Sequence, residues 1–304
     1  MRGTRPAFFA DPGAGSQQHL VTERFHARAR VWEDLYERND LISVIVRHRH
    51  NQALSWIDGL RLQPGSPALE IGPGAGMMTT ALAQRRFFIT GADTAPGMIE
   101  IARRRAAAAD VAGRVGLLIG EANRLPFADG EFSLVAALGV LAWLRPASTA
   151  VAEMTRVLRP GGYLIVNAEN RHRLNLLLDP RHYPVLDPAR LAAKAALRSV
   201  GITRLRDQGV RVAAHRLAGF DRMLADAGLQ IIKRCTLGFG PFTLMGLPAL
   251  PDQLGVRLNA RLQAFADRGV PGLRSAGGQY LVLACRPPEH AGLGGTAVVA
   301  DSFT

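Results

Sequence analysis

The sequence contains few cysteines and lysines and no long apolar run. Its 304 residues include two cysteines, Cys235 and Cys285, too few for a disulfide framework or a four-ligand metal site. The longest apolar run, Leu134 to Leu144, is about half as long as a bilayer-spanning helix. No apolar stretch follows Arg2 and Arg5, so we expect no secretory signal and a cytoplasmic location. These absences favour a water-soluble protein that binds no metal.

Positive charge is in excess, and nearly all of it is arginine. The formal net charge is +12, and Lys194 and Lys233 are the only lysines. The segment from Arg171 to Arg216 has ten arginines and lysines against three aspartates, a net charge of +7. Such a segment attracts acidic substrates, membrane surfaces or nucleic acid. A solvated helical face explains it equally well, and compositional bias explains the preference for arginine.

Short apolar runs alternate with helical stretches through the middle of the chain. Strands are predicted at residues 68–71, 87–92, 116–119, 134–138 and 162–168, and helices at 77–86, 97–109 and 147–158. A further helix is predicted near 220–227, and strands at 229–237 and 279–285. This order predicts an α/β protein with a Rossmann-like, doubly wound and mostly parallel sheet, whose ligands bind at the carboxyl ends of the strands.

The remaining segments differ in composition from this core. Residues 17–62 have a helical pattern and are predicted to form an N-terminal cap, followed by one domain over 63–288. Within that domain, 170–216 is predicted to be a basic helical insertion and 238–278 a lid-like excursion. Residues 1–16 and 289–304 are rich in small residues, and we expect them to be poorly ordered.

The strongest motif is a glycine loop between the first predicted strand and its helix. The strand ends at Glu70, and Gly72, Gly74 and Gly76 follow at alternate positions. Glycine permits positive φ and close approach of the backbone to a ligand. The dinucleotide pattern G-x-G-x-x-G/A has a third small residue where this sequence has Met77, and this argues against a nicotinamide oxidoreductase.

Two further loops end predicted strands and carry polar residues. Asp93 ends the second strand, nineteen residues after Gly74, where a carboxylate can accept hydrogen bonds from both ribose hydroxyls. It could also start the next helix as an N-cap. Glu121 and Ala122 follow the third strand, where a short polar side chain can read adenine, although an ordinary loop is the alternative. The turn Pro160-Gly161-Gly162 separates a predicted helix from the next predicted strand, and we assign it no chemical role.

Taken in order, four blocks resemble the small-molecule branch of the class I S-adenosylmethionine-dependent methyltransferases. They are LEIGPGAG, GADTAPGMIEIARRR, GEANRLPFADGEFSLV and RVLRPGGYLIV, and they lie between Pro67 and Ala168. The resemblance implies S-adenosyl-L-methionine as cofactor and a seven-stranded sheet whose last strand, 279–285, is antiparallel. The family more often has aspartate where this chain has Glu121.

The resemblance also implies roles for individual residues. Glu70 and the three glycines would line the methionine part of the cofactor, and Asp93 the ribose. Glu121 and Ala122 would lie at the adenine. The second block also brings Thr94 and Met98 to the cofactor. Tyr36, on the cap, would close over the amino-acid end, although packing is the simpler explanation for it. The cofactor-binding residues implied are Glu70, Gly72, Gly74, Gly76, Asp93, Thr94, Met98, Glu121, Ala122 and Tyr36.

No catalytic residue can be assigned from the sequence. A sulfonium methyl is already electrophilic, so a general base is optional. The candidates outside the nucleotide-binding core are His26, His172, His182 and His215, each of which is also explained by surface exposure or packing. No Asn/Asp-Pro-Pro-aromatic motif follows the fourth strand, as it does in enzymes that methylate amino groups of nucleic acids.

The acceptor is the least defined part of the prediction. A cationic insertion and an apolar excursion above the site suit a small acidic or amphiphilic acceptor, with Arg171 and Arg173 as its contacts. The alternatives are an RNA methyltransferase, suggested by the net charge but without a recognisable RNA-binding module, and a catalytically inactive protein that binds the cofactor. Transient contact with a membrane surface is compatible with the charge. The sequence says nothing about oligomeric state.

Overall fold

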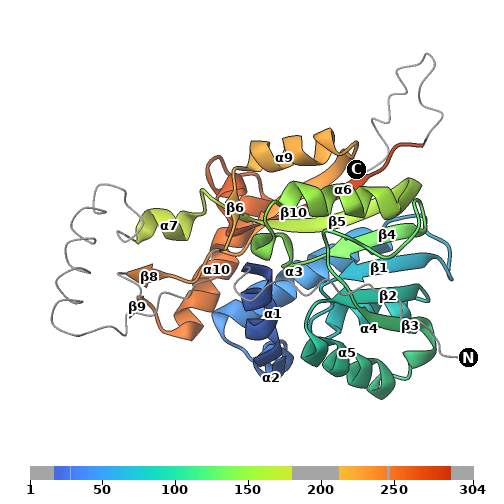
Figure 1. Ribbon diagram of the computed structural model, residues 1–304. Coiled ribbons are helices and arrows are strands. Elements are labelled where there is room, and N and C mark those ends of the chain that lie inside the picture. The colour runs from blue at the N-terminus through green and yellow to red at the C-terminus, as the bar shows by residue number, and fades with distance from the viewer. Residues whose placement is uncertain (1–16, 28, 180–211, 245–246, 289–304) are drawn as a thin grey trace, which may run out of the picture.

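A mostly parallel sheet forms the centre of the protein. The computed structural model describes residues 17–27, 29–179, 212–244 and 247–288. The strands are β1 (Pro67–Ile71), β2 (Phe88–Asp93), β3 (Val115–Ile119), β4 (Phe132–Ala137), β5 (Leu158–Asn170), β6 (Ala214–His215), β7 (Gln230–Leu237) and β10 (Gln279–Cys285). Seven of them follow the order β3-β2-β1-β4-β5-β10-β7, and the short β6 pairs with β5 (Figure 1). β10 runs antiparallel to both β5 and β7, so the predicted Rossmann-like sheet with an antiparallel last strand is confirmed.

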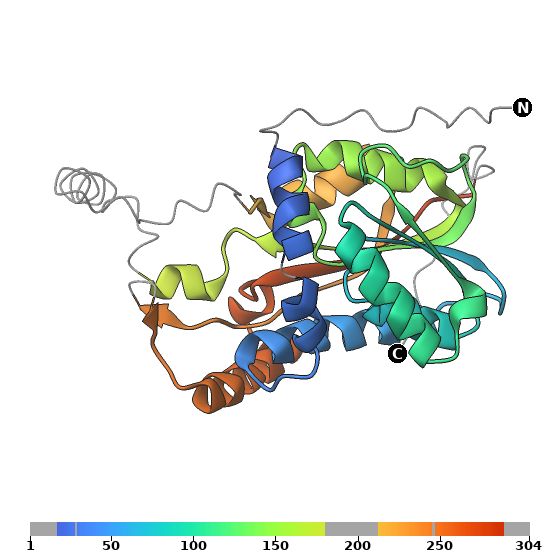
Figure 2. The same ribbon diagram turned by 60° about the horizontal axis from the view of Figure 1, so that its bottom comes forward.

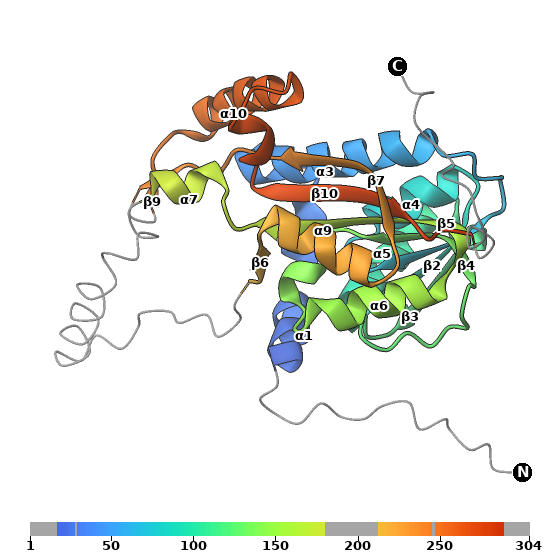
Figure 3. The same ribbon diagram turned by 90° about the horizontal axis from the view of Figure 1, so that it is seen from above.

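Helices cover both faces of this sheet, which explains why its strands read as continuous apolar runs. The helices that flank it are α3 (Leu41–Asp58), α4 (Met77–Gln84), α5 (Pro96–Ala108), α6 (Ala147–Val157) and α9 (Leu217–Asp226). Figure 3 shows α3 and α4 on one side and α6 and α9 on the other. Successive side chains of a strand face opposite ways, so Leu134 and Ala136 pack with α3 and α4, and Val135 and Ala137 pack with α6.

The predicted N-terminal cap consists of separate helices. α1 (Gln17–Ala27) and α2 (Ala29–Asp34) contact α5, and a turn then leads into α3. Asp40 caps α3, since its carboxylate accepts hydrogen bonds from the backbone N–H and the hydroxyl of Ser43, each at 2.9 Å. α1 and α2 therefore pack beside α5, and Asp40 marks the start of α3.

The chain after β5 crosses the same end of the sheet. It forms α7 (Leu174–Leu178), the hairpin of β8 (Thr243–Leu244) and β9 (Leu247–Pro248), and α10 (Asp252–Asp267). Short 3-10 turns lie at Ala112–Arg114, Leu141–Trp143 and Leu273–Ser275. Most of the predicted basic insertion, the whole of 180–211, lies outside the described residues, as do the two termini.

The second half of the predicted lid-like excursion packs against the N-terminal cap. α10 lies beside α3 (Figure 2) and buries two amide side chains. Asn259 accepts a hydrogen bond from the backbone N–H of Phe239 at 2.7 Å, and Gln263 accepts one from that of Gly238 at 3.0 Å. These bonds fix the loop after β7 at the end of the sheet, so the two ends of the excursion line the cavity, from Gly238 to Thr243 and at Gly278.

Candidate functional site

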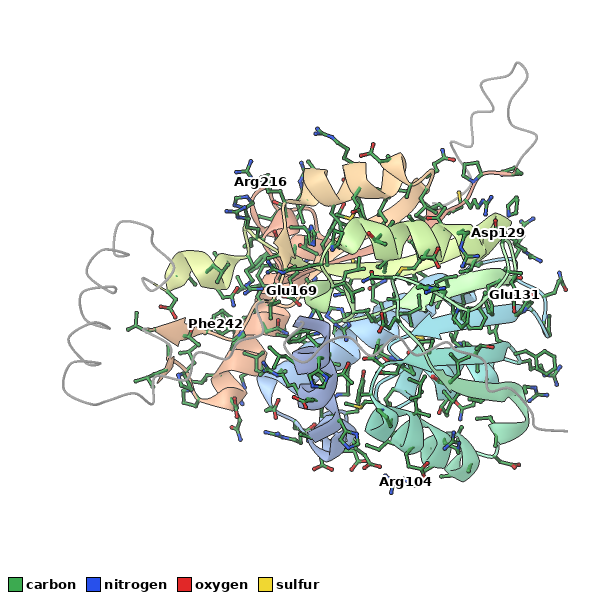
Figure 4. The ribbon with its side chains drawn as sticks, in the orientation of Figure 1. Arg104, Asp129, Glu131, Glu169, Arg216 and Phe242 are labelled. Atoms are coloured by element: carbon green, nitrogen blue, oxygen red, sulfur yellow. The ribbon has the colours of Figure 1, made fainter. Side chains whose placement is uncertain are left out.

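A cavity of about 590 Å³ lies at the carboxyl ends of the parallel strands. Its walls come from the glycine loop after β1, the ends of β2, β4 and β5, helices α1 to α3, and the segments that follow β5 and β7. Figure 4 labels Glu169 at this end of the sheet and Phe242 further out, whereas Asp129 and Glu131 lie at the opposite end. The volume is typical of a site for a nucleotide-sized ligand.

The glycine loop contributes two of its three glycines to the cavity. Gly72, Gly74 and Gly76 have φ values of +67°, +52° and +78°, which favour glycine. Gly72 and Gly74 line the cavity, but Gly76 does not. A Cβ on Gly76 would lie 2.8 Å from the Cα of Ala102, so this glycine permits α4 and α5 to pack closely. The cofactor role predicted for Gly76 is therefore at most an indirect one.

Asp93 is half-buried at the end of β2, and it lines the cavity. One oxygen accepts the backbone N–H of Ala95 at 2.9 Å, and the other lies 3.4 Å from the N–H of Gly74. Burial raises its pKa, and these backbone donors oppose the shift. The N-cap residue of α5 is Ala95, so Asp93 is tied to the helix start without being the cap. Thr94 and Met98 also line the cavity.

Glu70 is buried at the end of β1 and lines the cavity. Burial raises its pKa to about 7, although a hydrogen bond from the Thr79 hydroxyl opposes this. After β3, Ala122 lines the cavity and is buried. Glu121 is exposed, forms an isolated β-bridge with Arg124 and does not line the cavity, although Gly120 and Ala122 on either side of it do. The end of β3 therefore reaches the cavity without the Glu121 side chain, and the adenine contact of Glu121 stays a prediction.

Arg49 lines the cavity and was not singled out from the sequence. It is buried on α3, where its Nη1 donates to Gln279 Oε1 at 3.2 Å and its guanidinium is hydrogen-bonded to Tyr36. Its Nε has no hydrogen-bond partner. A signal was present, since Arg49 falls at helical spacing in the apolar stripe of Ile45, Val46 and Ala53.

Tyr36 and His50 complete this wall. Tyr36 lines the cavity, and burial raises the pKa of its hydroxyl, with Arg49 opposing the shift. The His50 ring lies 6.1 Å from the Tyr36 ring, edge to face. Burial, together with the charge of Arg49, lowers the pKa of His50 to about 4, so this histidine is neutral at physiological pH.

An ion pair occupies the end of β5. Arg173 Nη1 lies 2.8 Å from Glu169 Oε2, and both residues line the cavity. Burial raises the pKa of Glu169, and Arg173 and Arg49 oppose that shift. Arg173 Nε is buried and has no hydrogen-bond partner within the described part of the chain. The Glu169 carboxylate is therefore paired with Arg173 and also stabilised by the charge of Arg49.

The three histidine candidates that the structure describes do not line the cavity. His26 is exposed and its Nδ1 accepts the backbone N–H of Gly97 at 3.2 Å, and His172 is exposed. His215 is half-buried beside Phe220, and burial lowers its pKa. None of these three lines the cavity, and His182 falls outside the described residues. Within the described ranges no group of His, Cys, Asp or Glu could hold a metal ion, and no helix is both long and apolar enough for a membrane span.

Comparison with known proteins identifies the central part of the chain. Residues 69–166 match the methyltransferase domain family. A demethylmenaquinone methyltransferase of Beutenbergia cavernae is 35% identical over 145 residues, which are 46% of this chain and 57% of that relative. A malonyl-[acyl-carrier protein] O-methyltransferase of Serratia marcescens is 32% identical over 102 residues, which are 34% of this chain and 38% of that relative. The chain thus spans less than two thirds of the length of either relative.

Solved structures share the fold over most of the chain. The magnesium protoporphyrin IX methyltransferase of Synechocystis PCC 6803 with bound S-adenosylmethionine has a TM-score of 0.59 at 14% identity, covering 90% of this chain and 99% of its own. The [4+2]-cyclase SpnF has a TM-score of 0.55 at 18% identity, covering 90% and 96%. At these identities the likeness concerns the fold alone. Residues 69–166 therefore match a methyltransferase domain, and the fold is shared with solved structures that include a methyltransferase with bound S-adenosylmethionine, as the four sequence blocks predict.

Proposed function

We propose that this protein transfers the methyl group of S-adenosylmethionine to a small acceptor molecule. The supporting observation is that one cavity joins the glycine loop and Asp93 to a second compartment at the ends of β4 and β5. The bound cofactor supplies an electrophilic methyl group, so the protein needs mainly to align the acceptor and exclude water. Val21 and Phe25 of α1 line the same cavity.

The residues of the first compartment fit the cofactor. Asp93 is placed to accept hydrogen bonds from the ribose hydroxyls, and Ala122 gives an apolar wall for the adenine. Glu70 is a carboxylate that can face the methionine ammonium, which would hold it ionised. Arg49, whose Nε lacks a partner, and Tyr36 suit the methionine carboxylate. This assignment satisfies a buried donor that is otherwise orphaned.

Titration calorimetry tests the cofactor directly. S-Adenosylhomocysteine and S-adenosylmethionine are expected to bind with micromolar dissociation constants, whereas NADH is expected to give no heat of binding. The glycine loop is followed by Met77 where a dinucleotide site needs a small residue, so NADH is the informative control. Binding of NADH and of neither sulfur nucleoside would remove the proposal.

The second compartment suits an acceptor with an apolar body and an acidic group. Its walls include Leu138, Val140, Trp143 and Leu176, and its polar end is the pair of Glu169 and Arg173. Arg173 has an unpartnered Nε, which an acidic group of the acceptor would satisfy. The raised pKa of Glu169 makes its carboxylate a suitable proton acceptor for an acceptor hydroxyl. Glu169 thus takes the place of the predicted histidines as candidate base.

A pair of arginine variants tests the acidic group. With the cofactor site saturated by S-adenosylhomocysteine, we expect 2-naphthoate to bind about tenfold more tightly than neutral 2-naphthylmethanol, as one charge-assisted hydrogen bond predicts. Arg173→Gln should abolish this preference. Arg171→Gln is the matched control, because Arg171 is exposed and does not line the cavity. Equal binding of the two probes by the unmodified protein would contradict the acidic acceptor and leave the cofactor assignment intact.

A further inference from the structure

Gln279 lies between the two charged parts of the cavity. It is the first residue of β10, stands opposite Glu169 in the pairing of β10 with β5, and lines the cavity. Helix α3, which carries Arg49, packs along β10 and β7 (Figure 3). Gln279 Oε1 accepts a hydrogen bond from Arg49 Nη1 at 3.2 Å, and Gln279 Nε2 lies 3.5 Å from Glu169 Oε1. One amide therefore reaches both the guanidinium and the carboxylate.

An amide side chain suits this position for a chemical reason. A guanidinium only donates hydrogen bonds, and an ionised carboxylate only accepts them. An amide offers an acceptor oxygen to the first and a donor nitrogen to the second, and it carries no charge of its own. A carboxylate at position 279 would repel Glu169, and an aliphatic side chain would leave both neighbours without a hydrogen bond. Glutamine therefore satisfies two groups of opposite charge without neutralising either.

Arg49 and Glu169 have opposite charges and lie near each other, yet they form no ion pair. Within the described part of the chain, Glu169 pairs with Arg173 at 2.8 Å, and Arg49 Nε has no hydrogen-bond partner. Burial raises the pKa of Glu169, and Arg173 and Arg49 oppose that shift, so the Arg49 charge acts across the amide. Opposite charges attract more strongly away from bulk water. The Gln279 amide is the group that stands between these two.

We propose that Gln279 is a positioning residue that keeps Arg49 available for the methionine carboxylate by separating it from Glu169. This inference rests on the proposed function, in which Arg49 holds that carboxylate. Without the amide, the Arg49 guanidinium turns to Glu169, and a guanidinium engaged by a carboxylate of the protein is lost to the ligand. The same separation leaves Glu169 with one arginine partner, Arg173, on the acceptor side. Gln279 thus divides the charges of the cavity between cofactor and acceptor.

Titration calorimetry with two nucleosides isolates this role. S-Adenosylhomocysteine carries the carboxylate, whereas 5′-methylthioadenosine has the same nucleoside and sulfur without the amino-acid part. We expect Gln279→Met to weaken the binding of S-adenosylhomocysteine about tenfold, as the loss of one charge-assisted hydrogen bond predicts. Gln279→Glu should do the same, because the new carboxylate pairs with Arg49. The affinity for 5′-methylthioadenosine should not change in either variant. The matched control is Gln84→Met, because Gln84 is exposed on α4 and does not line the cavity.

A double variant tests the separation of charges itself. Gln279→Met combined with Glu169→Gln removes the carboxylate that would capture Arg49, so the affinity for S-adenosylhomocysteine should return to within about threefold of the unmodified protein. No recovery, or an equal loss of both nucleosides in Gln279→Met, would overturn the role proposed for Gln279.

Two results with the unmodified protein separate this inference from the proposed function. If S-adenosylhomocysteine bound no more tightly than 5′-methylthioadenosine, Arg49 would not hold the carboxylate, and the inference would fall with the cofactor assignment intact. Failure of both nucleosides to bind would instead remove the proposed function. Unfolding midpoints measured without ligand identify any variant that does not fold, and Gln279→Glu, which keeps the shape of the side chain, then carries the test.

Discussion

Replacing Asp93 with alanine is expected to weaken the binding of S-adenosylhomocysteine about 100-fold or more. The carboxylate is half-buried at the end of β2 and lines the cavity, where its position suits the two ribose hydroxyls. Hydrogen bonds to an ionised group each contribute about 1.5–3 kcal/mol, and about 1.4 kcal/mol corresponds to a tenfold change in affinity. The loss of two such bonds should therefore lower the affinity more than the loss of any other single side chain of the site.

The same substitution also removes hydrogen bonds that Asp93 makes within the protein itself. Asp93 accepts the backbone N–H of Ala95 and approaches that of Gly74, so the alanine variant could alter the loop itself. Asp93→Asn separates the two effects, because its amide keeps one acceptor oxygen for the backbone and lacks the charge. We expect its affinity to fall between those of the alanine variant and the unmodified protein. Unfolding midpoints measured without ligand identify any variant whose loss of binding reflects misfolding.

A distant carboxylate provides the control for this series. Asp58 is paired with Arg85 at 2.6 Å on the surface and does not line the cavity, so Asp58→Ala should leave the affinity unchanged. Titration calorimetry of the four proteins gives the comparison. A loss of less than about threefold in Asp93→Ala would mean that Asp93 holds the loop and does not bind the ribose.

The sequence predicted the sheet, and it also predicted most of the residues that line the cavity near the glycine loop, because both depend on short-range pattern. β1, the loop after it and α4 are consecutive, so their spacing can be read along the chain. Asp93 follows in the next strand, and parallel neighbours bring their carboxyl ends together. The predicted strand limits differ from those observed by a few residues, with the largest difference at β5, which extends from Leu158 to Asn170. Whether these residues bind the cofactor as predicted is what the titrations address.

The part of the cavity where the proposed cofactor and acceptor compartments meet depends on contacts between distant parts of the chain. Arg49 meets Gln279 across 230 residues of sequence, and no local pattern connects the two. Glu169 and Arg173 are four residues apart, yet their position beside Arg49 follows from the pairing of β5 with β10. The four histidines were selected by residue type alone, and the three in the described residues lie outside the cavity. A residue type indicates possible chemistry, whereas the fold decides whether it reaches the ligand.

The glycine loop illustrates the same distinction within one motif, because its glycines serve different purposes. Gly76→Ala is expected to lower the free energy of unfolding by about 2–4 kcal/mol. Alanine is strained at the left-handed φ of +78°, and its Cβ would lie 2.8 Å from the backbone of α5. Helix backbone cannot move aside as a flexible side chain can. For a domain of this size the unfolding midpoint should fall by roughly 5–15 °C.

Gly74→Ala is the matched variant in the same loop. Its φ is +52° and nothing lies within 4 Å of the added Cβ, so we expect a loss of only about 1 kcal/mol in stability. Gly74 lines the cavity, however, and a methyl group there takes up space that the cofactor needs. The substitution should therefore weaken the binding of S-adenosylhomocysteine about tenfold. Denaturant unfolding and calorimetry on both variants should therefore give opposite rankings. If Gly76→Ala left stability unchanged, the close packing of α4 on α5 would not be the reason for this glycine, and a direct role at the cofactor would return as its explanation.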